Sequence, residues 1–436
     1  MLQLALPATV DLLAMHRRFP SRYPFLLQSV AAHPQAGRYD ILFAGPESAI
    51  EARAGDADFF ERLDQAAAQL PRLASSEFPF AGGWFLLLGY EAARWAEPRL
   101  RLPASPYALP DALAVRCSAA VIVDRLLGTV TAISESSEAL LAQLAQDSAA
   151  SAVCPAMPAQ PPPVELCEDD EPRFLTGVER VLDYLQAGDV FQANLSRRWQ
   201  ARYAQPVDAV ALYEQLRKAN PAPFAGLASW GGSTVLSSSP ERLIEVADGI
   251  AQTRPIAGTH ARDRADDERD RERLIASLKE RAEHVMLIDL ERNDLGRIAV
   301  PGSVEVSELM TIESYAHVHH IVSNVRARLR DGVGPGAALR AVFPGGTITG
   351  APKVRAMEII AELEGVGRGP YTGAMGYLSR CGRLDTNILI RTLVCEGNTV
   401  SFRAGAGIVA DSRPHAELAE TRAKARGLLL ALGAVA

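Results

Sequence analysis

Two pairs of glutamates in the second half of this 436-residue chain have a spacing that could serve a metal ion. Glu280 and Glu283 are three residues apart, and Glu417 and Glu420 repeat the spacing, with Lys424 one helical turn further on. Residues three apart share a face of a helix, where two carboxylates repel each other unless a cation neutralises them. Carboxylate oxygens are also the ligands that Mg²⁺ prefers. The spacing leaves two interpretations open, a solvated charged face or a magnesium site.

An arginine within an apolar run is a second candidate. The alternation of a strand would place Leu389, Arg391, Leu393 and Cys395 on one face. A guanidinium among apolar side chains needs an anion, because a buried unpaired charge is too costly. The anion is either an internal carboxylate or the carboxylate of a substrate, which arginine can hold through two hydrogen bonds.

Two glycine-rich segments are similar to nucleotide-binding loops in part of their pattern. Residues 405–410 read GAGIVA, which fits the first turn of a dinucleotide-binding unit but lacks the strand and acidic residue that must follow. Residues 345–353 read GGTITGAPK and lack the Gly-Lys-Ser/Thr ending of a phosphate loop. We interpret the glycines as positions where backbone N–H groups approach an anionic ligand closely.

Three stretches must position these residues. Residues 261–296 predict a charged helix whose apolar members recur at helical spacing. Residues 383–411 predict two strands around a Gly-Asn turn, and residues 411–432 predict a helix with Pro414 in its first turn and Asp411 or Ser412 as its cap. The apolar positions expected on the first helix are Ile275, Leu278, Ala282 and Val285.

Residues 146–172 contain six prolines and many small residues, which predict an exposed connection without helix or strand. They separate an N-terminal region, residues 1–145, from a larger C-terminal part, residues 173–436. Strand-like runs precede the connection, and helical and strand patterns alternate after it, which indicates a mixed α and β fold.

Composition excludes several classes of protein. With 45 basic and 52 acidic residues the net charge is −7, which argues against nucleic-acid binding. No uncharged apolar stretch is long enough to span a membrane, and residues 1–13 lack the basic start of a signal peptide. Five scattered cysteines without a CxxC pair predict a cytoplasmic chain without a disulfide framework.

Seven segments, taken in order, resemble the chorismate-utilising enzymes. This family includes anthranilate synthase component I, aminodeoxychorismate synthase component I, isochorismate synthase and salicylate synthase. The resemblance covers about residues 175–432 and implies an α+β fold in which two antiparallel sheets face each other with helices packed outside. The segments are PIAGT (255–259), EHVMLIDLERNDLGRI (283–298), HIVSNV (320–325), PGGTITGAPKVRAMEII (344–360), RGPYTGAMGYLS (368–379), DTNILIRTL (385–393) and AGAGIVADS (404–412).

The resemblance implies roles for single residues. Glu283 and Glu420 match Mg²⁺ ligands, with Glu280 and Glu417 as partners through water, and the ion would stabilise charge as the C4 hydroxyl of chorismate departs. Glu241, in SSSPERL, matches the general acid that protonates this hydroxyl. The remaining matched positions line the ring pocket or contact the substrate carboxylates, and they are His320, Thr347, Tyr371, Arg391, Gly405, Gly407, Lys424, Gly258 and Thr259.

The residue at position 192 indicates the nucleophile. Relatives that add water carry a basic lysine in a K-V-x-L-S segment, whereas this chain reads FQANLS with Gln192, which resembles the ammonia-using branch. QANLS and PGGTITGAPK look more like aminodeoxychorismate synthase, which makes 4-amino-4-deoxychorismate. Ala257 stands where many of those relatives place a nucleophilic lysine, and PIAGT is also the anthranilate synthase form. Anthranilate synthase and a catalytically silent binding subunit therefore stay open as alternatives.

The resemblance also implies partners. No glutaminase signature occurs in the chain, so ammonia would come from a separate glutamine amidotransferase. YPFLLQS, residues 23–29, resembles the family's amino-acid-binding element, in which Ser29 would contact an effector. That element usually ends in LLES, and Gln28 replaces its glutamate here.

Overall fold

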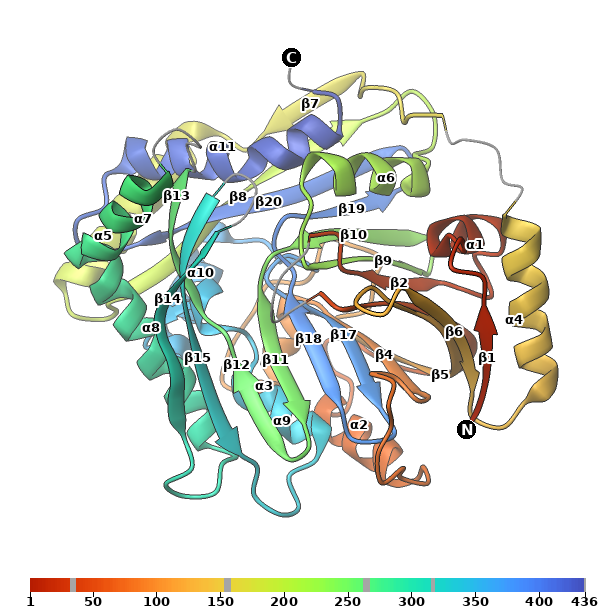
Figure 1. Ribbon diagram of the computed structural model, residues 1–436. Coiled ribbons are helices and arrows are strands. Elements are labelled where there is room, and N and C mark those ends of the chain that lie inside the picture. The colour runs from red at the N-terminus through yellow and green to blue at the C-terminus, as the bar shows by residue number, and fades with distance from the viewer. Residues whose placement is uncertain (32–36, 153–157, 262–266, 315–317, 435–436) are drawn as a thin grey trace.

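Two long strands organise the β-structure. The structure is a computed structural model that describes residues 1–31, 37–152, 158–261, 267–314 and 318–434. Strands β3 (Tyr39–Ala52) and β5 (Ala112–Asp124) pair along their whole length, with an irregularity in register between Pro46 and Ala49. Strands that bend at such irregularities can pass from one sheet to another. β3 and β5 do so here, and they join two antiparallel layers into one hydrogen-bonded network (Figure 1).

The first layer begins on the part of β5 that pairs with β4, residues 112–117. It continues through β17, β18, β11 and β12 to β15, which also pairs with β13 and β14. Its strands are β4 (Gly83–Leu88), β11 (Arg242–Ala247), β12 (Ile250–Thr253), β13 (Ile256–Ala261), β14 (Glu305–Ser314), β15 (Val318–Arg328), β17 (Ala374–Ser379) and β18 (Leu384–Ile388).

The second layer begins on β3 and runs through β2, β9, β10, β19 and β20 to β8. At one end β6 pairs with β5 and β1 with β6, and at the other end β7 and β16 pair with β8. Its strands are β1 (Leu2–Leu6), β2 (Phe25–Gln28), β6 (Thr129–Ser134), β7 (Glu165–Glu168), β8 (Gln192–Arg202), β9 (Phe224–Trp230), β10 (Ser233–Ser239), β16 (Gly350–Ala351), β19 (Thr392–Glu396) and β20 (Thr399–Ile408).

The two layers face each other across an apolar core. Phe25 of β2 stacks on Phe85 of β4 with ring centroids 3.9 Å apart, and Phe43 of β3 packs edge-on against Phe85. Neighbouring side chains alternate along β4, so Leu86 and Leu88 enter a second core on the outer face of the first layer. The continuous run GWFLLL is therefore buried on both faces.

Helices cover both outer faces, as predicted (Figure 1). The family resemblance implied an α+β fold of two facing antiparallel layers, and the structure confirms it. None of the described helices combines the length and the apolar character that crossing a bilayer requires. The helices are α2 (Phe59–Ala68), α3 (Ala93–Ala96), α7 (Asp267–Ala276), α8 (Leu278–Gly296) and α9 (Pro335–Val342) around the first layer, α1 (Leu12–Arg18), α4 (Glu138–Ser151), α6 (Ala209–Ala219) and α11 (Pro414–Ala431) on the second, and α5 (Glu171–Gln186) and α10 (Lys353–Glu364) against β8.

The N-terminal region contributes strands to both layers, because β2 pairs with β9 and β4 pairs with β17. The stretch 146–172 was expected to lack helix and strand, and this expectation is wrong at both of its ends. Helix α4 runs on to Ser151, since QDSAAS contains nothing that breaks a helix, and β7 adds an edge strand to β8. Residues 153–157 lie outside the described residues.

The predicted charged helix is two helices. Ser277 ends the first and caps α8, its hydroxyl accepting a hydrogen bond from the Glu280 N–H at 3.3 Å. Ile275 and Val285, expected on the apolar face, are 44% and 47% exposed. Leu287 and Ile288 are buried instead, because α8 packs on β13 and β15 through that side.

Two expectations near the C-terminus also need correction. The strand predicted around residue 391 is interrupted, since β18 ends at Ile388 and β19 begins at Thr392, whereas the Gly-Asn turn between β19 and β20 is confirmed. Helix α11 begins at Pro414 as predicted, but neither proposed cap serves it. The Ser412 hydroxyl accepts from the Val409 N–H at 3.1 Å instead.

Candidate functional site

The chain crosses between the two layers at residues 389–391. Arg391 has φ +51, in the left-handed region, where a non-glycine residue needs support from its surroundings. Its carbonyl accepts from the Ser238 N–H at 3.1 Å. Leu389 exchanges backbone hydrogen bonds with Thr372 and Gly373, both 2.8 Å long, which holds the loop of Tyr371 beside this crossing. Arg391 is thus half-buried at a crossing, and the expected alternation with leucines on one strand is wrong.

Tyr371 and Lys424 meet at Gly405. A Cβ added at Gly405 would lie 2.7 Å from Asn194 Oδ1 and 2.8 Å from the Tyr371 hydroxyl, so the position requires glycine. Lys424 of α11 donates to the Gly405 carbonyl at 3.1 Å and pairs with Glu420 at 2.7 Å. Burial raises the pKa of Tyr371 to about 12, so its hydroxyl remains a hydrogen-bond donor at neutral pH.

The side-chain amide of Gln192 packs against Gly407, which lies on β20 two residues after Gly405. Its Nε2 lies 2.4 Å from where a Cβ of Gly407 would be, so Gly407 makes room for the amide. Gln192 and Asn194 are two apart on β8, are both buried, and point to the same face. Gln192 Oε1 and Asn194 Oδ1 have no hydrogen-bond partner among the described residues. Two buried acceptors therefore lie side by side on β8, able to bind a small donor.

Glu241 follows β10 and is buried beside Thr347 of the short helix η2 (Gly346–Ile348). The Thr347 hydroxyl donates to Glu241 Oε1 at 2.7 Å. Burial raises the pKa of Glu241 to about 7, while the Thr347 hydrogen bond and the charges of Lys424 and Arg391 oppose the rise. A carboxyl with this pKa can hold and release a proton at neutral pH, which is what a general acid needs.

Strands β13 and β15 carry the remaining predicted positions. Ala257 is buried and pairs with Ile321, and Thr259 pairs with His320, while the register shifts at Gly258 between them. His320 is buried on β15. The structure describes the backbone of Gly258 and Thr259 but not the Thr259 side chain.

The four glutamates of the predicted metal site lie on α8 and α11. Glu417 is buried in the first turn of α11, and Glu420 is half-exposed and paired with Lys424. Their oxygens are the hard ligands that suit Mg²⁺. Within the described residues, no three acidic, histidine or cysteine side chains come together closely enough to hold an ion. The structure thus joins Thr347 to Glu241, and Tyr371 and Lys424 to Gly405, whereas the metal site stays a prediction.

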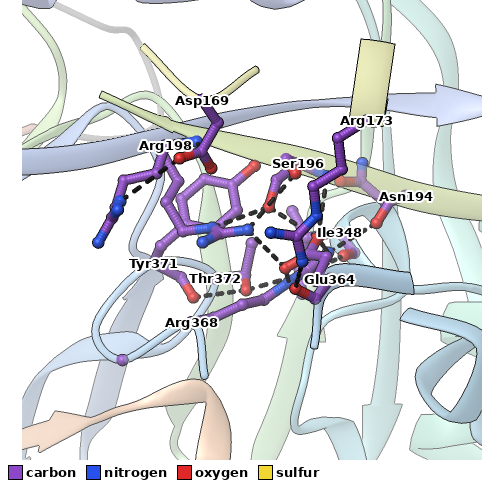
Figure 2. Close-up of polar contacts among 12 residues, drawn as sticks. Asp169, Arg173, Asn194, Ser196, Arg198, Ile348, Glu364, Arg368, Tyr371 and Thr372 are labelled. Carbon is purple, nitrogen blue, oxygen red and sulfur yellow. Dashed lines mark hydrogen bonds and ion pairs between the residues drawn. The ribbon is translucent and has the colours of Figure 1, made fainter. Parts of the chain in front are cut away.

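Two buried charged clusters were missed in the sequence. Glu364 forms ion pairs with Arg368 and Arg403, and Figure 2 shows Glu364 and Arg368 near Tyr371. Lys353, which matched no catalytic position, is buried in an ion pair with Asp294. Arg403 could have been predicted as a buried cation from the sequence. SFRAGAG places it among small and apolar strand residues, as NILIRTL does for Arg391.

A cavity of about 740 Å³ includes neither Glu241 nor the predicted chorismate-binding residues in its lining. Ser29 is the one predicted position in its lining, which also includes Gln28, Arg242 and Asp385. The Ser29 hydroxyl donates to the Pro223 carbonyl at 3.0 Å. The cavity therefore adjoins the proposed effector element rather than the acid Glu241.

Known proteins resemble the chain over nearly its whole length. A family model described as chorismate binding enzyme matches residues 23–430. An anthranilate synthase component I-like protein of Synechocystis sp. is 42% identical, and the match covers 92% of this chain and 84% of the relative. Aminodeoxychorismate synthase component 1 of Salmonella typhimurium is 40% identical, and the match covers 92% of this chain and 90% of that relative. The crystal structure of anthranilate synthase component I from Streptococcus pneumoniae superposes with a TM-score of 0.81 at 32% identity, covering 91% of this chain and 92% of that one.

Proposed function

Because the chain belongs to the family of chorismate-binding enzymes, we propose that it is component I of an aminodeoxychorismate synthase, which aminates chorismate to 4-amino-4-deoxychorismate for para-aminobenzoate and folate synthesis. Anthranilate synthase component I is the second candidate, favoured by Ala257 and by the names of several relatives. A catalytically silent subunit is disfavoured, because Glu241 is buried and hydrogen-bonded as a general acid would be.

The observation that carries amination of chorismate, which both candidates share, is the pair of buried amide oxygens on β8. Ammonia has N–H donors for both Gln192 Oε1 and Asn194 Oδ1, which are buried and lack hydrogen-bond partners among the described residues. Water activation would instead need a base, and the lysines nearest the site are already engaged, Lys424 with Glu420 and Lys353 with Asp294. This supports ammonia rather than water as the nucleophile.

In the proposed reaction Glu241 supplies the proton. At neutral pH about half of its population is protonated, and the C4 hydroxyl of chorismate leaves as water when it takes this proton. Ammonia attacks C2 and loses a proton, which gives 2-amino-2-deoxyisochorismate. Thr347 holds the carboxyl of Glu241 in place through its 2.7 Å hydrogen bond.

Positive groups and a hydroxyl would hold the two carboxylates of chorismate. We assign Tyr371 and Arg391 to the enolpyruvyl carboxylate, and Lys424 with the backbone at Gly405 and Gly407 to further carboxylate contacts. Thr259, Gly258 and His320 on β13 and β15 would line the ring. The charges of Lys424 and Arg391 already act on Glu241, which supports one shared pocket.

Mg²⁺ is proposed as the cofactor, with Glu283 and Glu420 as ligands and Glu280 and Glu417 bound through water. The bound ion would polarise the ring carboxylate and stabilise charge as the hydroxyl departs. All four donors are carboxylates, which suits this ion. Lys424 neutralises part of the charge of Glu420 in the structure.

Ala257 restricts the routes by which the 4-amino product could form, because its side chain has no nucleophile. A methyl group cannot attack C2, so we propose that no lysine adduct forms and that a second ammonia attacks C4 of the 2-amino intermediate. The ring double bonds shift, the C2 amino group takes up a proton and leaves as ammonia, and the attacking nitrogen loses a proton. Release of pyruvate from that intermediate would instead give anthranilate. Ammonia would come from a separate glutamine amidotransferase in the cytoplasm, and an amino-acid effector near Ser29 remains a proposal.

Product identification tests the function. The protein is incubated with chorismate, Mg²⁺ and ammonium, and chromatography separates 4-amino-4-deoxychorismate from anthranilate. Gln192→Met should lose the ammonia-dependent rate, whereas Gln200→Met, an exposed position on the same strand, should keep it. Anthranilate as the sole product would establish the second candidate, and an absence of turnover would favour the silent subunit.

A further inference from the structure

Three ionised side chains are buried together behind the loop of Tyr371. Glu364 ends α10, Arg368 lies on the loop that leads to Tyr371, and Arg403 lies on β20 two residues before Gly405. Figure 2 shows Arg368 extending toward Glu364 from the same loop as Tyr371 and Thr372. The cluster thus connects a helix, a loop and a strand that all bear on the proposed carboxylate site.

Glu364 is the central acceptor. Its Oε1 accepts from the Ser196 N–H at 2.9 Å, the Ser196 hydroxyl at 2.7 Å and Arg368 Nη2 at 2.7 Å. Its Oε2 accepts from Arg368 Nε at 3.1 Å and from Arg403 Nη2 at 2.7 Å. The two guanidinium groups hold the pKa of Glu364 below its usual range although burial opposes this. The carboxylate therefore stays charged and fixes both arginines.

Arg368 links this carboxylate to the site. Its Nη2 donates to the Asn194 carbonyl at 2.7 Å, and its Nη1 donates to the Ile348 carbonyl at 3.2 Å and to the Thr372 hydroxyl at 3.3 Å. The guanidinium also lies 5.6 Å from the centre of the Tyr371 ring. One side chain thus contacts β8, the segment next to Thr347, and both the ring of Tyr371 and the residue that follows it.

The loop around Tyr371 needs such support. Gly369 has φ +59 and Thr372 has φ +63, so two residues of the loop are in the left-handed region. For a threonine this conformation is unfavourable by about 1–2 kcal/mol and persists only where neighbouring contacts hold it. Glu91 contributes as well, since it accepts from the Arg368 N–H at 2.7 Å.

We propose that Glu364, Arg368 and Arg403 form a positioning network that fixes the Tyr371 hydroxyl over Gly405 and thereby sets the affinity for the substrate carboxylate. This inference rests on the proposed function, because chorismate is taken as the ligand. A buried ion network adds little stability compared with apolar packing, so its main effect is expected on the geometry of the site.

The test combines kinetics with a double-mutant cycle. Arg368→Lys cannot reproduce the forked contacts, so KM for chorismate should rise about tenfold or more, and kcat should stay within about threefold. Tyr371→Phe alone should also raise KM. If the network acts through Tyr371, adding Tyr371→Phe to Arg368→Lys should have little further effect, because the two changes remove one interaction.

Arg116→Lys is the matched control, since Arg116 on β5 is also buried and donates to the Cys117 carbonyl at 2.7 Å away from the predicted site. It should change the melting temperature but leave KM unaltered. Arg403→Lys provides a second network variant if Arg368→Lys does not fold. Additive effects of Arg368→Lys and Tyr371→Phe, or an unchanged KM in both network variants, would overturn the network. Failure of the wild-type protein to bind chorismate in calorimetry would overturn the proposed function instead.

Discussion

The pKa of Glu241 predicts a measurable pH dependence. Burial raises this pKa from 4.5 to about 7, which corresponds to about 3 kcal/mol of preference for the protonated carboxyl. Since the raised pKa belongs to an acid that must be protonated to act, kcat/KM for chorismate should be high below pH 7 and fall above it. The protonated fraction is about a half at pH 7 and about a tenth at pH 8, so the rate should fall about fivefold between them.

Thr347 allows the assignment to be tested. Its hydroxyl favours the ionised form of Glu241, so Thr347→Val should raise the pKa further. A hydrogen bond to a charged group contributes about 1.5–3 kcal/mol, which would move the alkaline fall in rate up by about one to two pH units. Thr347→Ser retains the hydroxyl and should keep the wild-type profile.

The assay must hold free ammonia constant, because ammonium itself deprotonates as the pH rises. Initial rates are measured from pH 6 to 9 at fixed ammonia and Mg²⁺. The carboxylates of chorismate stay ionised over this range and cannot produce the fall. A flat profile, or a fall that Thr347→Val leaves in place, would refute the role of Glu241 as the acid.

Three further outcomes are expected. Glu283→Ala or Glu420→Ala should abolish turnover while circular dichroism stays unchanged, and full activity at ordinary Mg²⁺ would remove these residues from the metal site. Arg391→Leu should raise KM for chorismate about 100-fold, as expected for loss of a charged hydrogen-bonded clamp, and an unchanged KM would limit this arginine to a structural role. Intact-protein mass spectrometry after incubation with chorismate without ammonia should show no adduct, whereas Ala257→Lys should permit one; an adduct on any native lysine would exclude direct attack by ammonia.

Local patterns predicted the Gly-Asn turn between two strands, strand-like runs before residue 146 and the last helix, but not the paths between layers. GWFLLL reads as a strand because all six residues are compatible with burial, and Pro414 marks the start of α11 correctly. The interruption at Arg391 was not predictable, since alternation along NILIRTL continues through a point where the chain changes sheets. The partner strands that force this change, β11 and β10, lie about 150 residues earlier.

In the candidate site, too, single positions could be predicted from the sequence, whereas the contacts between them could not. Glu241 and Tyr371 were found through resemblance to a family, which supplies positions without their contacts, and Arg391 was also indicated by the apolar run around it. The hydrogen bond from the Thr347 hydroxyl to Glu241 was not expected. Such contacts join side chains from distant segments of the chain. The local patterns of a single sequence do not show which segments will meet. The prediction that Ile275 and Val285 lie on a buried helix face was wrong for a related reason. The strands that pack against α7 and α8 determine which face of each helix is buried.

The pairing of β4 with β17 has a consequence for synthesis on the ribosome. The Ala81 N–H donates to the Ser379 hydroxyl, which lies 298 residues later in the chain. One edge of β4 can pair with β5 early, but at about 5–20 residues per second the other edge must wait roughly 15–60 s for β17 to emerge. During that interval the continuous apolar run of β4 has one unpaired edge open to association with other nascent chains. Folding of the first layer is thus largely post-translational, and a chaperone that shields residues 83–88 should raise the yield of active protein.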